Sequence, residues 1–310
     1  IYTANVVVDE EYCKAHSDAR PGPFVCLRVA DTGTGTYTVG IAPTVAEPLV
    51  LHLRANDEPL RNTFTINVLP GPAVAITSDA TFPATSVAGA SVSFTLAARD
   101  AYNNTVSTND DVFALNACPI EGGACVTDIN QGPGEVKGSY LAEFTATQAG
   151  AYRIEVLLGG ELVSGHAYSL LVTPAAISPV TTTEAGTGLA DGIAGRANTF
   201  EIYARDAYDN SVPNRASDLE VTITPQFEGP AARGAIEHSG DTDGTYTVSY
   251  VVFAGGMYDI DITLATGENI TSVPYEAFVT HGDVDGSKCV QSGMNTQGAT
   301  DITAGANQTV

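Results

Sequence analysis

The sequence contains no tryptophan and only three lysines, Lys14, Lys137 and Lys288. Its 310 residues include 36 acidic side chains and 13 basic ones, which gives a formal net charge of −23 at pH 7. A surface this negative repels nucleic acid and anionic lipid, so we expect neither as a partner. No segment approaches the roughly 18 consecutive apolar residues that a membrane helix needs, so we expect no membrane insertion of this segment.

Catalytic signatures are missing as well. The sequence has no G-x-S-x-G elbow, no H-E-x-x-H pair and no Walker glycine loop. Its five histidines are scattered without the spacing of metal ligands. We therefore expect a protein that is not an enzyme and has no organic cofactor.

Repetition is the dominant feature that is present. The phrase RDAYNN begins at Arg99, and RDAYDN begins at Arg205. These Asp- and Asn-rich phrases could be twin metal or catalytic sites, or one turn used in each copy of a repeated fold. Glycine-led phrases around Tyr37, Tyr140 and Tyr246 recur at intervals of 103 and 106 residues. The sequence is therefore built from a repeated unit, and the second interpretation is favoured.

Within each unit the apolar residues alternate with polar ones. Phe94 and Leu96 are separated by Thr95, and the stretch YDIDITL from Tyr258 alternates in the same way. Strict alternation is typical of half-buried strands, and Asp and Asn are favoured in the turns between strands. Short strands separated by such turns predict an all-β fold of antiparallel sandwiches.

The units resemble the filamin-type immunoglobulin repeat. The resemblance rests on an A-G-x5-F-x-I/L-x-A-R-D-x-x-x-N block, then D-G-x-Y-x-V-x-Y, then a G-x-Y-x-I-x-V/I strand. It implies a seven-stranded sandwich for each repeat, joined head to tail into a rod without catalytic activity. It covers essentially the whole chain.

The repeat pattern also predicts domain boundaries. We expect the later strands of one repeat in residues 1–71, complete repeats in 72–174 and 175–280, and the start of a further repeat in 281–310. The simplest interpretation is a window cut from a longer array. A second interpretation is that the last residues complete the first repeat of a neighbouring copy by strand donation.

Four of the five cysteines form two short-range pairs, Cys13 with Cys26 and Cys118 with Cys125. Without C-x-x-C spacing or nearby histidines they indicate disulfides rather than zinc sites, and free buried thiols are the alternative. In the filamin-type pattern both pairs would close the hairpin between the third and fourth strands. Cys289 is expected to pair outside the segment, with a cysteine further along the chain or in another chain.

Three sequons fit the pattern N-x-[ST], at Asn103, Asn269 and Asn307. Together with paired cysteines they favour an oxidising, extracytoplasmic location and N-linked glycans.

The Asp283 and Asp285 pair resembles the beginning of a calcium loop. The remaining ligands and the flanking helices are missing, so turn formation is the alternative to calcium binding.

The third repeat lacks the cysteine pair, and the resemblance implies a strand edge there that can accept a partner peptide. The residues that would form this edge are Val221, Ile223, Ala235 and Ile236. An edge blunted by Pro225 and loop residues is the alternative.

Three functions remain open at this point. The first is a structural or adhesive component of an extracellular cell-surface fibre or appendage, for which a ciliary or flagellar surface is one concrete location. Its partners would be neighbouring repeats or subunits of the fibre. The second is an intracellular rod segment that crosslinks actin, and the third is the ectodomain of a cell-adhesion receptor.

Overall fold

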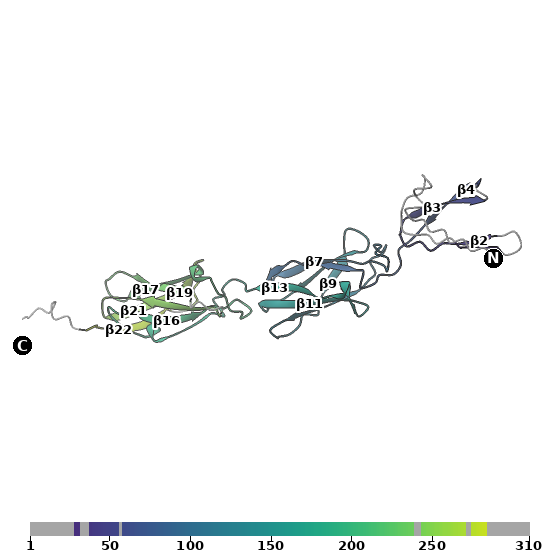
Figure 1. Cartoon of the computed structure of the whole chain (residues 1–310). Coiled ribbons are helices and arrows are strands. Elements are labelled where there is room, and N and C mark those ends of the chain that lie inside the picture. The colour runs from purple at the N-terminus through teal and green to yellow at the C-terminus, as the bar shows by residue number, and fades with distance from the viewer. Residues whose placement is uncertain (1–27, 32–36, 56–57, 239–242, 271–273, 284–310) are drawn as a thin grey trace, which may run out of the picture. The chain divides into compact units, whose positions relative to one another are not determined.

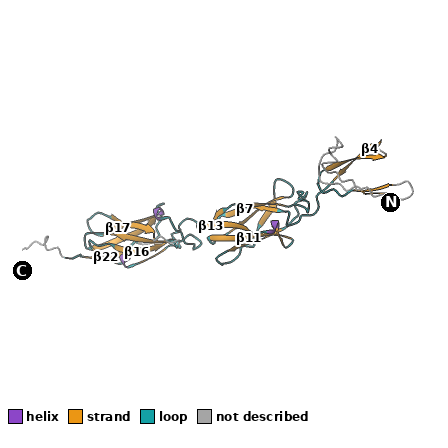
Figure 2. Ribbon diagram, in the orientation of Figure 1, coloured by secondary structure: helices purple, strands orange, loops and turns teal. Residues whose placement is uncertain are grey.

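The structure is a computed structural model, and it describes residues 28–31, 37–55, 58–238, 243–270 and 274–283. The chain divides into two units, Ile1–Ala175 and Ala176–Val310, and in both of them the described residues form strands joined by loops (Figures 1 and 2). The predicted all-β fold is confirmed. The described residues contain no α-helix, only the short 3-10 turns η1 (Val163–Gly165), η2 (Thr187–Leu189) and η3 (Ala216–Asp218). None of the described helices has the length and apolar character required to cross a bilayer.

The second repeat, which we expected in residues 72–174, is a sandwich of two sheets. The first sheet has the strand order β5 (Asp79–Thr81), β7 (Ser91–Ala97), β10 (Ser139–Thr145), β9 (Asn130–Pro133). The second sheet contains β12 (Glu161–Leu162), β11 (Gly150–Leu158), β13 (Tyr168–Thr173), β6 (Thr85–Val87) and, on the other edge of β11, β8 (Phe113–Pro119).

The third repeat has the same arrangement except that the short strand β18 lies beside β17 and no strand corresponds to β12. Its first sheet has the order β14 (Thr183–Ala185), β16 (Asn198–Tyr203), β20 (Thr245–Tyr250), β19 (Ala235–His238). Its second sheet has the order β15 (Asp191–Ile193), β22 (Tyr275–Thr280), β21 (Gly256–Leu264), β17 (Leu219–Pro225), β18 (Ala232–Arg233).

Alternation in the sequence becomes alternation in burial. On β7 the side chains of Val92, Phe94 and Leu96 are buried, while those between them are exposed or partly exposed. Phe94 stacks on Phe82 in the core between the two sheets. Burying a side chain of this size contributes about 1.5–3 kcal/mol to folding. Each of the two repeats has such a core of its own.

Two short ladders are described before the second repeat. β1 (Arg28–Asp31) pairs with β2 (Tyr37–Gly40), and β3 (Pro48–Ala55) pairs with β4 (Glu58–Asn67), both antiparallel. We refer to residues 28–67 as the first repeat, and they belong to the same unit as the second. The residues 284–310, where we expected a further repeat, lie outside the described part of the chain.

Candidate functional site

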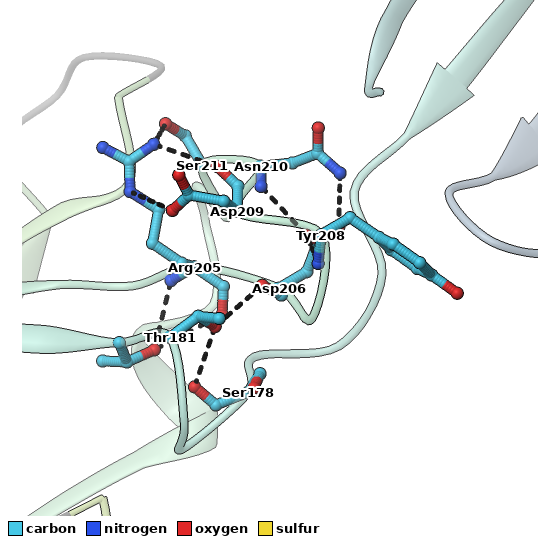
Figure 3. Close-up of polar contacts among 9 residues, drawn as sticks. Ser178, Thr181, Arg205, Asp206, Tyr208, Asp209, Asn210 and Ser211 are labelled. Carbon is cyan, nitrogen blue, oxygen red and sulfur yellow. Dashed lines mark hydrogen bonds and ion pairs between the residues drawn. The ribbon is translucent and has the colours of Figure 1, made fainter. Parts of the chain in front are cut away.

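The repeated RDAY phrase forms a corner at the end of β7 and again at the end of β16. In the third repeat, Asp206 is fully buried and its carboxylate accepts hydrogen bonds from the backbone amides of Tyr208 and Asn210, both at 2.9 Å. The Asn210 side chain donates to the same carboxylate at 2.8 Å (Figure 3). Arg205 covers the corner and donates to Ser211 Oγ at 2.9 Å.

The corner of the second repeat has the same construction. Asp100 is 2% exposed and accepts from the backbone amides of Tyr102 and Asn104, both at 2.9 Å. Burial raises the pKa of the Asp100 carboxyl, but the hydrogen bonds from Asn104, Gly71 and Tyr102 outweigh burial and hold this pKa below its ordinary value of 3.8. The two phrases are therefore one structural corner used twice, and both carboxylates are occupied by donors from their own corner.

One residue of the corner lies in the left-handed region, and its identity differs between the repeats. It is Asn103 with φ 69° in the second repeat and Asp209 with φ 67° in the third. Asn and Asp tolerate this conformation better than most residues. The Asn103 side chain is exposed, which leaves its sequon accessible.

The second sequon lies at the equivalent end of the third repeat. Asn269 is exposed after β21 and forms a bridge with Thr263, whereas the next residue, Ile270, is buried. Each of these two asparagines lies at the end of its own repeat where the RDAY corner lies. Asn307 is outside the described residues.

Cys118 and Cys125 are joined by a disulfide, which is the pairing expected from the sequence. The expected hairpin between the third and fourth strands is wrong, because β8 and β9 belong to opposite sheets. The disulfide instead closes a small loop beside β8, in which Ala117 and Val126 exchange backbone hydrogen bonds of 2.9 and 2.8 Å. Cys13, Cys26 and Cys289 lie outside the described residues.

The β17 side of the predicted peptide edge in the third repeat is occupied by the chain itself. Val221 and Ile223 lie on β17, where Ile223 pairs with Ala232 of β18 and Val221 O accepts from Gly234 N at 3.1 Å. Ala235 and Ile236 lie on β19 and pair with β20 in the other sheet. The prediction of an open edge is wrong for Val221 and Ile223, because β18 fills the position beside β17 that a peptide would take. β19 is the last strand of its sheet, so the edge at Ala235 and Ile236 stays a prediction.

The Asp283 carboxylate forms a salt bridge with the Arg196 guanidinium, with 2.9 Å between the two groups. Asp285 is outside the described residues. Among the residues that the structure describes, no group of three or more His, Cys, Asp or Glu side chains is placed to hold a metal ion. Calcium binding at Asp283 and Asp285 stays a prediction.

Two polar contacts were not expected from the sequence. The Gln131 side chain donates to Asp111 O at 2.8 Å and accepts from Phe113 N at 3.2 Å. Its carboxamide therefore forms, at the start of β8, the two backbone hydrogen bonds that a neighbouring strand would form. Asn104 contacts the loop that precedes β3, at Thr44 and Ala46. The signal for Asn104 was present, because asparagine ends both RDAY phrases although the residue before it differs.

Comparison with known proteins agrees with this geometry. Residues 177–276 match the family model described as the Filamin/ABP280 repeat. These residues are a filamin repeat. The second repeat has the same strand order as this filamin repeat apart from the two-residue strands β12 and β18.

Two curated relatives carry the same name. Filamin-C of Rattus norvegicus is 30% identical over 163 residues, and filamin-C of Mus musculus is 29% identical over the same length. Each alignment covers 51% of this chain and 5% of the relative. The chain thus spans only a small part of the length of these filamins.

Two solved structures share the fold over most of the chain. The Escherichia coli adhesin FdeC has a TM-score of 0.54 and 21% identity, and the match covers 81% of this chain and 80% of FdeC. Invasin, a bacterial integrin-binding protein, has a TM-score of 0.51 and 15% identity, with 79% of this chain and 48% of invasin covered. At this identity the likeness shows the fold alone and nothing about binding.

Proposed function

We propose that this chain is a structural or adhesive, non-enzymatic segment of an extracellular cell-surface fibre or appendage, built from filamin-type repeats. The observation that carries the proposal is the Cys118–Cys125 disulfide within a repeat of this fold. Disulfides form and persist in oxidising compartments and are rare in the cytosol. The exposed sequon at Asn103 supports the same location.

The fold has precedents at cell surfaces, in an Escherichia coli adhesin and in an integrin-binding bacterial protein. They support the proposal as examples of how such arrays are used. The acidic composition fits a role in which the surface stays soluble and the contacts are made between neighbouring repeats or subunits. The ciliary or flagellar location stays a prediction of the sequence alone.

The second candidate is an intracellular rod segment that crosslinks actin. The 30% identity to filamin-C favours it. It requires free thiols and unmodified sequons, so the two candidates differ in their covalent chemistry. A receptor ectodomain would share the chemistry of the first candidate and differ in its partner.

Peptide mapping of native protein without reductant separates the candidates. We expect a linked peptide pair containing Cys118 and Cys125, and a mass on the Asn103 peptide that a glycosidase removes. Alkylation of both thiols in unreduced native protein would exclude the extracellular fibre and favour the actin rod. An Asn103→Asp variant is the matched control for the glycan, because Asp209 occupies the same left-handed position in the third repeat.

A further inference from the structure

The Asn104 side chain joins two repeats of one unit. Its Nδ2 donates to Thr44 O at 2.8 Å, and its Oδ1 accepts from Ala46 N at 3.0 Å. Thr44 and Ala46 belong to the loop between β2 and β3 in the first repeat, whereas Asn104 belongs to the corner of the second. The carboxamide therefore forms a pair of hydrogen bonds with the backbone, of the kind that one strand offers to another.

Asp100 fixes the orientation of this carboxamide. Asn104 Nδ2 also donates to Asp100 Oδ2 at 2.9 Å, so one N–H points at the carboxylate and the other at the Thr44 carbonyl. Rotating the amide by half a turn would place Oδ1 against these two acceptors and Nδ2 against the Ala46 amide, which is a donor. Only one orientation satisfies all three groups.

The same carboxylate holds the segment that connects the two repeats. Gly71 N donates to Asp100 Oδ2 at 2.9 Å. Beside this contact lies a hollow of about 310 Å³, whose lining includes Pro43, Leu69, Pro72 and Tyr102. A buried carboxylate thus anchors the connecting segment, and through Asn104 it also anchors the loop of the first repeat.

We propose that the Asp100–Asn104 corner is a joint site that binds the Thr44–Ala46 loop of the preceding repeat and restricts motion between the first and second repeats. The site recognises backbone atoms, a carbonyl at one residue and an amide two residues later, so its partner is a loop of this geometry whatever its side chains. The biological meaning of a restricted joint rests on the proposed role as a fibre segment. The contact itself does not.

The first test is hydrogen exchange on the full chain, followed at single amides. We expect Asn104→Ala to speed exchange of the Ala46 amide by roughly 2- to 10-fold, the loss of one hydrogen bond, while Gly71 stays protected by Asp100. Protection of the core amide of Ile154 checks that the second repeat remains folded. An Ala46 amide that exchanges equally fast in the unchanged chain and in Asn104→Ala would overturn the proposal.

Two further variants separate this joint from the proposed glycan. Asn104→Ala leaves the Asn103 sequon intact, because its middle position accepts any residue but proline. Asn103→Asp removes the sequon, and we expect it to leave Ala46 protected. A protected Ala46 in unglycosylated protein would thus support the joint even where the extracellular role fails.

The second test measures the joint directly. Spin labels on noncanonical residues at the exposed positions Thr65 on β4 and Ser93 on β7 report distances between the two repeats. We expect a narrow distance distribution in the otherwise unchanged chain and a broader one with Asn104→Ala. Asn210→Ala, at the equivalent position of the third repeat, is the control and should not change the width. Equal widths with and without Asn104→Ala would contradict a restricting joint.

Discussion

At the scale of single residues, a buried carboxylate organises each repeated corner. Asp100 and Asp206 accept hydrogen bonds from backbone amides and from an asparagine four residues later. Bonds to a charged acceptor are stronger than those between neutral groups. The left-handed residue, Asn103 or Asp209, differs between the corners, and its backbone amide donates to the carbonyl oxygen of the buried aspartate at 2.9 or 3.0 Å. The residues that both corners share build the turn, whereas the residue that differs is exposed in both repeats.

Removal of the Asp100 carboxylate should destabilise the second repeat. We expect Asp100→Ala to lower its free energy of unfolding by about 2–4 kcal/mol, because several partly buried donors lose their acceptor at once. Urea denaturation measures the change. Asp128→Ala is the control, since Asp128 is an exposed aspartate of the same repeat, and its effect should stay within about 0.5 kcal/mol. Similar losses in both variants would contradict the role of Asp100.

The same carboxylate predicts a dependence of stability on pH. The pKa of Asp100 is lowered in the folded protein, so its stabilisation is complete above its ordinary pKa of 3.8 and is lost as the pH falls through the lower folded value. We expect Asp100→Asn to flatten the decline of unfolding free energy below about pH 4. The measurement is the unfolding free energy of both proteins between neutral and acidic pH, and parallel curves would contradict it.

At the scale of elements, the third repeat closes one side of its sandwich with a single segment. Residues 232–238 pair first with β17 in one sheet, as β18, and then with β20 in the other, as β19. Gly234 lies where the segment crosses, and an added Cβ there would meet Val248 Cγ1 at 2.8 Å and Val221 Cβ at 3.2 Å. A side chain at this position would therefore force the valines around it to shift.

This crowding predicts a cost for one methyl group. Gly234→Ala should lower the unfolding free energy of the third repeat by about 1–3 kcal/mol, as overpacking of a core does. Gly229→Ala is the matched control, because its Cβ would meet its nearest neighbour, Pro225 Cγ, at an ordinary 3.5 Å. Thermal unfolding of the two variants checks the difference. Equal midpoints would show that the sheets separate easily at Gly234.

The sequence predicted the strands well and their pairing less well. Alternation marks Phe94, Leu96 and Ile260 as core residues because the period of a strand is written locally. The prediction of an open peptide edge on β17 failed because strand pairing is not local. Nothing in the sequence near Ala232 shows that this residue pairs with Ile223. Gln131 and Asn104 were missed for a related reason, since a flexible polar side chain can reach several partners and only the fold decides which one it meets.

At the scale of the whole chain, the second and third repeats have separate hydrophobic cores. The contacts divide the chain after Ala175, between these two cores. Compact domains of this size usually unfold in a single cooperative step each. A destabilising change inside one core should therefore act on the transition of that repeat and not on the other.

The disulfide offers a way to test this separation, because the third repeat contains no cysteine between residues 176 and 283. Replacing both Cys118 and Cys125 by serine opens a loop of sequence separation 7, and we expect it to destabilise the second repeat by about 2.5 kcal/mol. Calorimetry should show the unfolding transition of the second repeat at a lower temperature and that of the third repeat unchanged. Gly234→Ala should lower the temperature of the third repeat's transition, and a protein that carries all three substitutions should show both shifts additively. A single transition that moves with either change would mean that the two cores unfold together.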